Sequence, residues 1–256
     1  MSKPIILWTH PRSTSTAFER AFMTRNDIEC FHEPYGDVYY FAKDRMNYRY
    51  TEEEAKESGH WSTTWQDVSN QLLKEYPGKR VFVKDMAQYI IHPETHKLMV
   101  PVETLRKFTH TFLIRCPEKS VKSYYRCCTG EQSKKTGFKY FDPAENGYPE
   151  LRALFNIIKE IDDTLVIESC QHLDNPQAAI EKFCKFVKLE YDSGMLDWKD
   201  DSNTNKFDKW TGFHDQVIKS NGFQKFERKD GTFPEIVQKT INDVQKHYDY
   251  LKQFVQ

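Results

Sequence analysis

Short apolar segments that alternate with helical patterns restrict the fold of this chain more than any other feature. Segments that are almost continuously apolar cover Pro4–Thr9, Ile28–His32, Arg80–Lys84, Thr109–Arg115 and Thr164–Glu168. Helical patterns cover Thr14–Arg25, Thr63–Tyr76, Val102–Lys107, Pro117–Cys128, Pro149–Ile161, Pro176–Val187 and Phe233–Phe254. Such apolar runs are typical of strands buried on both faces, and their alternation with helices is typical of a parallel sheet. We therefore predict a three-layer α/β fold, a mostly parallel sheet flanked by helices, with right-handed crossovers and a helical C-terminal extension.

The chain is long enough for one large domain, so we predict a single domain over residues 1–256. Residues 35–65 are rich in Tyr and Trp without a clear period. They form either an insertion that faces the substrate or ordinary aromatic core. Residues 198–232 are polar and irregular, and form either a lid over the site or a solvated connection. The basic and aromatic side chains of the second segment that favour a lid are Lys206, Lys209, Trp210 and His214.

The balance of charge excludes several classes of partner. A formal net charge of -1 gives no broad basic field for a nucleic acid or an anionic membrane, so any anion must be recognised locally. Apolar runs are too short for a membrane span, and the N-terminal run is too short for a signal peptide, so we expect a cytoplasmic protein. The six cysteines show neither a Cys-x-x-Cys pair nor a zinc spacing, and we expect reduced thiols and no metal.

The stretch "THPRSTSTAF" follows the first predicted strand and leads into a helix. Backbone N–H groups at the start of a helix bind anions, and ligands of parallel sheets gather at the carboxyl ends of the strands. An arginine and several hydroxyls strengthen that interpretation. A single Ser or Thr at this point is also a common helix N-cap, which is the structural alternative. The side chains that we expect to bind the anion are Arg12, Ser13, Thr14, Ser15 and Thr16.

A second strand end has a similar composition. Arg115 ends the strand Thr109–Arg115, and the helix that Pro117 opens carries Ser123 two turns further on. These two side chains are candidates for a second phosphate, although an isolated arginine more often pairs with a carboxylate. The glycine-containing segment Gly130–Phe138 lacks the Walker spacing and follows a helix, so we predict that it is a surface loop.

Together the two segments resemble the motifs of the PAPS-dependent sulfotransferases, which bind 3′-phosphoadenosine 5′-phosphosulfate (PAPS) on a P-loop-type fold. "PRSTSTAF" is similar to the 5′-phosphosulfate loop of the carbohydrate and tyrosylprotein branches, and "LIRCPEKSVKSYY" is similar to the 3′-phosphate motif. The resemblance implies that Arg12 and residues 13–16 hold the 5′-phosphosulfate, while Arg115 and Ser123 hold the 3′-phosphate. The family's late Arg-Lys-Gly motif has no clear counterpart here; its candidates are Lys219, Arg228 and Lys229.

Catalytic candidates lie at the ends of the second and third strands. Lys84 and Arg12 are cations that would stabilise charge on the leaving group. Met86 stands where the cytosolic branch of the family has a histidine base, so another base is needed. Glu33 resembles the carboxylate base of the branches that share the Pro-Arg-Ser loop, and we expect partial desolvation to raise its pKa.

Other residues near these strand ends leave alternatives open. His32 and Asp85 are second choices for the base. Glu33 could instead form a salt bridge to Arg12 or cap a helix. His10 is expected to line the same pocket.

These observations favour a sulfotransferase that moves the sulfuryl group from PAPS to a hydroxyl or amine of a small-molecule acceptor. A nucleoside or metabolite kinase is disfavoured, because the loop lacks the Walker lysine. A catalytically silent binding module that kept the fold is the alternative from another class, and the missing histidine supports it.

Overall fold

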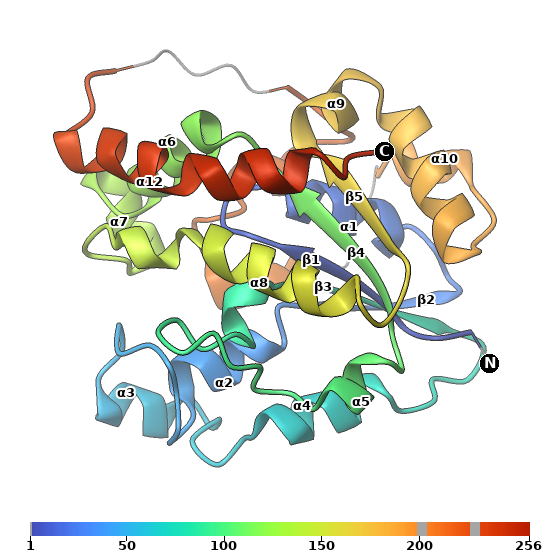
Figure 1. The fold of residues 1–256 in the computed structure, drawn as a ribbon, viewed down its shortest axis with the longest axis horizontal. Helices are drawn as coiled ribbons and strands as arrows, with labels where there is room; N and C mark the ends of the chain where they lie inside the picture. Colours follow the sequence, from blue (N-terminus) through green and yellow to red (C-terminus); the bar gives the residue numbers. More distant parts are fainter. Residues whose placement is uncertain (1, 199–203, 226–230) are drawn as a thin grey trace.

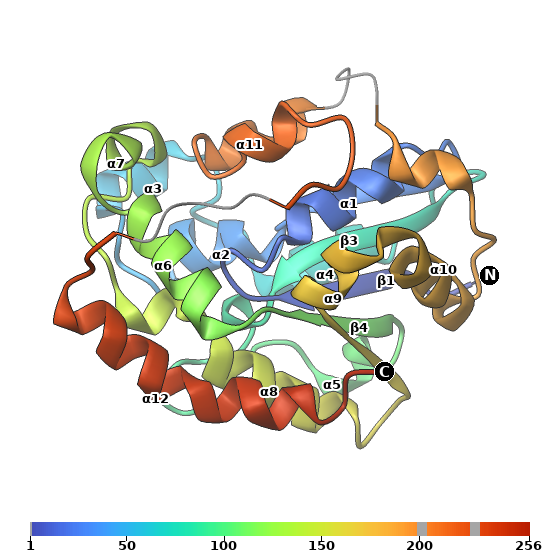
Figure 2. The same cartoon turned by 90° about the horizontal axis from the view of Figure 1, so that it is seen from above.

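A fully parallel five-stranded sheet forms the centre of the molecule (Figures 1 and 2). The structure is a computed structural model that describes residues 2–198, 204–225 and 231–256. The strands are β1 (Ile5–Thr9), β2 (Ile28–His32), β3 (Arg80–Met86), β4 (Thr109–Ile114) and β5 (Thr164–Glu168). Their order is β2-β3-β1-β4-β5, and every neighbouring pair is parallel. The predicted α/β fold with a mostly parallel sheet is confirmed.

Alternate residues of the strands supply two separate cores. Ile6 and Trp8 of β1 point to one face, while Ile5 and Leu7 point to the other. The helices α2 (Tyr35–Phe41), α4 (Trp65–Leu72), α8 (Tyr148–Ile158) and α12 (Glu235–Lys252) pack on the first core. The helices α1 (Ser15–Met23) and α10 (Pro176–Val187) pack on the second. Figure 2 shows α1 and α8 on opposite sides of the sheet, which gives the three predicted layers.

Strands and long helices agree with the sequence prediction to within a few residues. β2, β5 and α10 have the predicted bounds, whereas β3 runs two residues further, to Met86. β4 ends at Ile114, so Arg115 lies in the turn that leads to α6 (Pro117–Cys127). The short helix α5 (Val102–Leu105) precedes β4. The C-terminal helix α12 packs along α6 and α8, as Figure 1 shows.

Several short helices have no periodic pattern in the sequence. They are α3 (Glu52–Glu57), α9 (Ser169–Asp174) and α11 (Asp215–Ile218), together with the 3-10 helices η1 (Ala87–Tyr89), η2 (Pro143–Asn146), η3 (Ser193–Leu196) and η4 (Thr204–Trp210). The prediction of a surface loop over Gly130–Phe138 is wrong, because residues Gly130–Thr136 form the helix α7. No residue of α7 is buried, so no apolar face marks it. Within the described residues, none of the helices combines the length and the apolar character that a membrane span requires.

Candidate active site

A cleft of about 670 Å³ lies at the carboxyl ends of the strands. It brings together side chains that are far apart in the sequence, from the turn after β1, the ends of β2 and β3, and α6. Eight of the nine predicted site residues line it, namely Arg12, Thr14, Ser15, Thr16, Glu33, Lys84, Arg115 and Ser123, whereas Ser13 does not. The sequence prediction that these residues share one site is therefore consistent with the geometry.

Backbone strain is concentrated in the turn after β1. Arg12 and Thr14 adopt left-handed conformations, with φ of 62° and 71°. Thr14 is the N-cap residue of α1, but its side chain does not cap the helix; its hydroxyl lies 2.8 Å from the Ser169 hydroxyl. The alternative of a simple Ser or Thr cap is therefore wrong for this helix. The Ser13 hydroxyl is buried without a hydrogen-bond partner, which fits a turn built to receive a ligand.

The two predicted anion motifs contact each other. The Arg115 guanidinium donates to the Arg12 carbonyl at 2.8 Å, and Arg12 Nε donates to the Ser123 hydroxyl at 3.1 Å. Among the described residues no carboxylate forms an ion pair with Arg115, so the carboxylate alternative is wrong, and Arg115 Nε is buried without a partner. His10 does not line the cleft as predicted. It is fully buried, and its Nε2 accepts a hydrogen bond from the Arg115 N–H at 3.1 Å.

Glu33 and Lys84 form a buried ion pair at the ends of β2 and β3. Register places Lys84 beside His32, and the Glu33 N–H donates to the Lys84 carbonyl at 2.8 Å. Tyr89 donates its hydroxyl to Glu33 Oε2 at 3.2 Å. Glu33 has a φ of 50°, a costly conformation that is typical of functional sites. Its predicted salt bridge to Arg12 is replaced by this pair with Lys84.

The pKa of Glu33 departs from the expectation. Burial alone raises this pKa, but the charge of Lys84, followed by that of His32 and the hydrogen bond from Lys84, brings it below its usual value. The predicted rise in the pKa is therefore wrong. Glu33 is ionised at neutral pH, but it is a weaker base than an unpaired buried carboxylate would be.

The second choices for the base lie outside the cleft wall. Asp85 accepts hydrogen bonds from the backbone N–H groups of Tyr35 and Met86, at 3.0 and 2.8 Å. Burial raises the pKa of Asp85 to about 8. His32 lies beneath Glu33, where its Nδ1 is 2.6 Å from Glu19 Oε2. Asp85 therefore organises the backbone, and His32 can act only through Glu33.

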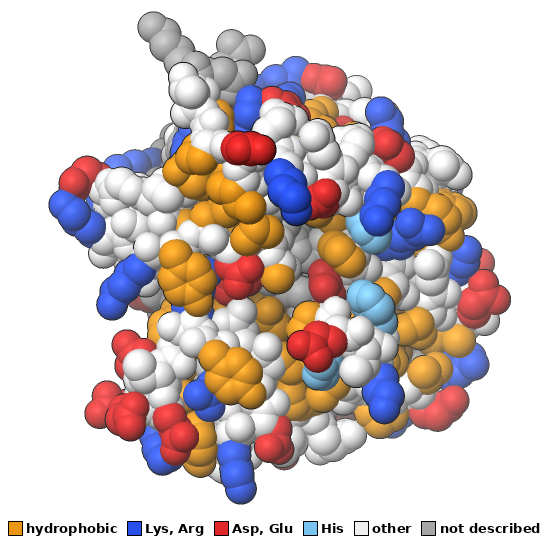
Figure 3. All heavy atoms as spheres, turned by 60° about the vertical axis from the view of Figure 1, so that its left-hand side comes forward, with side chains coloured by type: hydrophobic (Ala, Val, Ile, Leu, Met, Phe, Trp, Pro, Cys, Tyr) orange, Lys and Arg blue, Asp and Glu red, His pale blue; other side chains and the backbone are white. Residues whose placement is uncertain are grey.

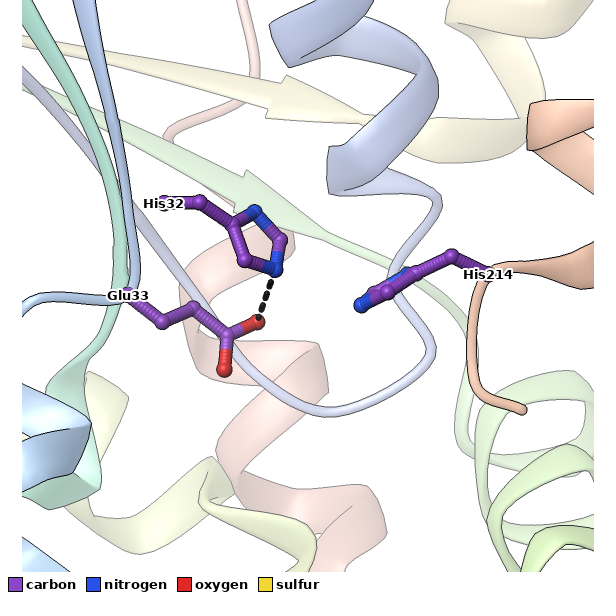
Figure 4. Close-up of side chains that lie close together, drawn as sticks. All are labelled: His32, Glu33 and His214. Carbon is purple, nitrogen blue, oxygen red and sulfur yellow. Dashed lines mark ion pairs between the residues drawn. The ribbon is translucent and has the colours of Figure 1, made fainter. Parts of the chain in front are cut away.

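Figure 4 shows His32, Glu33 and His214 pointing toward one another. Their ligand atoms lie within 4.8 Å of one another, and this is the one such group among the described residues that could hold a metal ion. His and Glu side chains are common zinc ligands. However, the Lys84 ammonium group already contacts Glu33 Oε1, so a cation at this point would face a like charge. The expectation that no metal is needed stays a prediction.

The described part of residues 198–232 lies against the turn after β1. The Arg12 guanidinium donates to the Phe213 carbonyl at 2.5 Å, and the Thr16 hydroxyl lies 3.0 Å from His214 Nδ1. Lys209 donates to the Glu33 carbonyl at 3.0 Å. Lys219 is exposed and does not line the cleft. The other two candidates for the late cofactor motif, Arg228 and Lys229, lie outside the described residues.

Sequence reasoning identified Trp210 and the Tyr-rich residues 35–65 as candidates but missed the rest of the aromatic wall and part of the basic wall of the cleft. The aromatic side chains are Tyr40, Tyr89, Tyr124, Phe138, Trp210 and Phe213. They come from four separate elements and two loops, so no local pattern groups them. Lys225 is one additional basic residue of the wall, and three more, Lys119, Lys122 and Arg126, all lie on α6. Their three- and four-residue spacing along the helix of Ser123 is a signal that could have identified them.

Charge is not concentrated on the face that Figure 3 shows, which lies over α3, α7 and the start of α12 in Figure 1. Basic and acidic side chains are interspersed there, with hydrophobic patches between them. This distribution agrees with the small net charge. A negatively charged ligand would therefore be selected by the cations of the cleft rather than by a broad field.

One family model matches almost the whole chain. Residues 3–252 match the family model described as "Sulfotransferase domain". A curated relative from Arabidopsis thaliana, named branched-chain-amino-acid aminotransferase-like protein 2, is 22% identical over 253 residues; the match covers 96% of this chain and 39% of that protein. The chain thus spans about two fifths of that relative's length.

Two solved structures share the fold. A sulfotransferase from Alicyclobacillus acidocaldarius has a TM-score of 0.55 and 10% identity, with coverage of 100% of this chain and 96% of that one. A mouse sulfotransferase complexed with PAP has a TM-score of 0.55 and 12% identity, with coverage of 99% and 89%. At this level of identity the likeness concerns the fold alone.

Proposed function

The chain belongs to the sulfotransferase family, and we propose that it transfers the sulfuryl group of PAPS to a hydroxyl or amine of a small-molecule acceptor. One observation carries the proposal: the cations and hydroxyls of both predicted anion motifs line a single cleft that also contains a buried carboxylate. A donor with phosphates at both ends and an acceptor with a proton to lose need all of these groups within one cavity.

The donor would bind along the turn after β1 and α6. Two buried polar atoms there, Ser13 Oγ and Arg115 Nε, have no hydrogen-bond partner and would gain one from phosphate oxygens. In this proposal Arg115 and Ser123 hold the 3′-phosphate, and the backbone and hydroxyls of residues 13–16 hold the 5′-phosphosulfate. Arg12 contacts Ser123, so its guanidinium lies where it can bridge the two ends of the donor.

The acceptor would lie against the aromatic wall with its reacting atom at Glu33. Sulfuryl transfer resembles phosphoryl transfer, in which positioned cations stabilise the charge that develops on the leaving oxygen. Lys84 is the buried cation next to Glu33, and we assign it this role. Glu33 would remove the acceptor's proton as the new bond forms.

Titration with 3′,5′-adenosine bisphosphate, the desulfated donor, tests the donor site. We expect saturable binding by calorimetry and a raised melting temperature, and weaker binding of 5′-AMP, which lacks the 3′-phosphate. Arg115→Met should weaken binding of the bisphosphate at least tenfold and leave the affinity for 5′-AMP almost unchanged. No binding of the bisphosphate at millimolar concentration would remove the basis of the proposal.

Glu33→Gln tests the base. With PAPS and a panel of phenols, alcohols and amines, we expect this variant to lose on the order of 10²–10⁴-fold in rate, since general base catalysis contributes that much. Its affinity for the bisphosphate should remain within about threefold, because Glu33 is assigned to the acceptor side.

A catalytically silent module is the second candidate, favoured by the methionine at position 86 and by the lowered pKa of Glu33. It predicts binding of the bisphosphate without sulfate transfer to any acceptor of the panel. A kinase is disfavoured by the absence of a Walker lysine, and it would show transfer from ATP and Mg²⁺ instead.

A further inference from the structure

The ion pair with Lys84 creates a difficulty for Glu33 as a base. A carboxylate whose pKa lies below its usual value holds a proton weakly, so a proton taken from an acceptor would be readily returned. Glu33 is also 2% exposed, and a bound donor and acceptor would cover the cleft in front of it. A proton that leaves Glu33 during turnover therefore needs a route through the protein.

Such a route is built behind Glu33. His32 lies between two buried carboxyl groups: its Nε2 is 3.7 Å from Glu33 Oε1, and its Nδ1 is 2.6 Å from Glu19 Oε2 (Figure 4 shows the first contact). Glu19 is fully buried, and His32 is 8% exposed. His32 Nε2 has no hydrogen-bond partner, so its lone pair or proton is available to Glu33. Distances of this kind often shorten when substrates bind.

We propose that Glu33, His32 and Glu19 form a proton relay in which Glu19 is the final acceptor of the proton that Glu33 removes. This inference rests on the proposed function. The acceptor O–H bond breaks as its oxygen binds sulfur, and its proton passes to Glu33. Glu33 then gives a proton to His32 Nε2, while the proton on His32 Nδ1 passes to Glu19. His32 remains neutral and changes tautomer, so no ion is created inside the protein. As the new bond to sulfur forms, the bond between sulfur and the 5′-phosphate oxygen breaks and the bisphosphate is the leaving group. After both products leave the cleft, the proton returns through His32 and Glu33 to water.

The chemistry of Glu19 fits the terminal position. Burial raises the pKa of Glu19 well above its usual value, opposed by Lys84 and increased further by Glu33. Because Glu19 holds a proton more strongly than Glu33 does, transfer between them runs downhill. Charged or titratable groups that face the relay from neighbouring elements are Lys84, Lys206, Lys209 and His214.

The relay has a defined pH dependence. It accepts a proton only when Glu19 is ionised and His32 carries its proton on Nδ1, leaving Nε2 free. Protonation of Glu19 fills the relay before reaction, so the rate should fall as pH decreases through a pKa above 4.5. If the contact between His32 and Glu19 were purely structural, the pH–rate profile would show no such fall on its acid side.

Glu19→Gln is the most informative variant. A glutamine amide cannot take up the proton from His32 Nδ1, so transfer from Glu33 has no terminal acceptor whichever way the amide faces. With PAPS and the best acceptor, we expect kcat to fall on the order of 10²-fold with KM nearly unchanged, and the acid limb above 4.5 to disappear. Glu150→Gln is the matched control: it removes another buried carboxyl whose pKa burial raises to about 7, away from the cleft, and should retain wild-type kcat and pH profile.

The imidazole tautomer gives a readout that does not need activity. With ¹⁵N-labelled histidine, and His32→Asn to assign the signal, the wild-type protein at pH 8.5 should carry the His32 proton on Nδ1, and protonation of Glu19 at lower pH should move it to Nε2. A wild-type His32 that carries its proton on Nε2 throughout pH 6–9, or a Glu19→Gln enzyme with the wild-type rate and profile, overturns the relay. If wild-type protein transfers no sulfuryl group at all, the proposed function fails instead, and the tautomer still decides whether the relay is assembled.

Discussion

At the scale of single residues, the site depends on the buried ion pair between Lys84 and Glu33, because neither charge would be stable there without the other. Lys84 is 1% exposed and Glu33 is 2% exposed at their side chains. Burying either charge without the other would cost several kcal/mol. The sequence indicates both residues as candidates, but their pairing follows from the register of β2 against β3, which no local pattern encodes.

Lys84→Met should destabilise the folded protein by about 3–5 kcal/mol at pH 7, because it leaves the Glu33 carboxylate buried and unpaired. The loss should shrink as pH falls below 4.5. Glu33 has a lowered pKa when Lys84 is present, so the stability from the pair is present above the unfolded value and is lost as pH falls through the folded value. Urea unfolding at several pH values measures both effects.

A second Lys–Glu pair across the same strands provides the control. Lys79 lies 2.8 Å from Glu29, but both side chains are partly exposed. Lys79→Met should cost less than about 1 kcal/mol. Equal losses of stability in Lys84→Met and Lys79→Met would contradict this role of burial. The double variant Glu33→Gln with Lys84→Met should be more stable than Lys84→Met alone, and an equal or lower stability would contradict it too.

At the scale of elements, the packing of α7 against the segment around Gly212 supports the cleft. Gly212 has a φ of 82°, and a side chain there would meet Lys135 Cβ at 2.9 Å. Gln132 of α7 donates to the Gly212 carbonyl at 2.5 Å. The next two residues, Phe213 and His214, contact the turn after β1. A change at Gly212 should therefore be felt at the predicted donor site.

Gly212→Ala should weaken binding of the bisphosphate by about tenfold and lower stability by more than the ~1–2 kcal/mol that a left-handed Ala costs. Gly137→Ala is the matched control, since Gly137 also has a positive φ, of 74°, but has open space around it. It should pay only the backbone cost and keep its affinity for the bisphosphate. Calorimetry and thermal melts compare them, and equal affinities in the two variants would contradict this role of Gly212.

The sequence predicts elements well where burial leaves a periodic signal and poorly where it does not. β5 is recognised because it is an apolar run buried along almost its whole length, and α10 because its apolar side chains share one stripe. β2 is found with the right bounds, but it is an edge strand whose alternate residues are only partly buried, so the expectation that it is buried on both faces is wrong. α7 has no buried residue, so its helix leaves no stripe. α2 follows Glu33 so closely, and is so aromatic throughout, that its buried side chains conceal the helical period.

At the scale of the whole molecule, the strand order assembles the site. β1 lies between β3 and β4, so the turn after β1 has the end of β3, with Lys84, on one side and Arg115 on the other. The sequence predicts that strand ends converge on one edge of a parallel sheet, but it does not fix their order. The aromatic wall of the cleft depends on this order too, which is why it could not be predicted.

Buried titratable groups with opposite effects on stability are distributed through the whole molecule. Burial lowers the pKa of His10 and His32 to about 3 and that of His110 and His172 to about 4, and it also lowers that of His214. Burial raises the pKa of Asp85 to about 8 and that of Glu150 to about 7. Below pH 6.5 the histidines are protonated in the unfolded chain but stay neutral in the folded protein. The buried carboxyls behave in the opposite way: they stay protonated in the folded protein but are ionised in the unfolded chain.

These opposed groups predict that stability is greatest near pH 6.5. Between pH 4.5 and 6.5 the histidines outnumber the carboxyls, so the free energy of unfolding should rise with pH by on the order of 2–3 kcal/mol per unit. Above 6.5 the unfolded histidines are neutral and only the carboxyls act, so stability should decline by about 1–3 kcal/mol per pH unit toward pH 8. His110→Asn should reduce the acid slope by about 1.4 kcal/mol per pH unit, because each neutral histidine contributes one proton. Urea unfolding at pH 5, 6.5 and 8 measures how the free energy of unfolding depends on pH. The histidines make stability rise with pH and the carboxyls make it fall. A stability that rises steadily to pH 8 would therefore mean that the buried carboxyls are ionised in the folded protein.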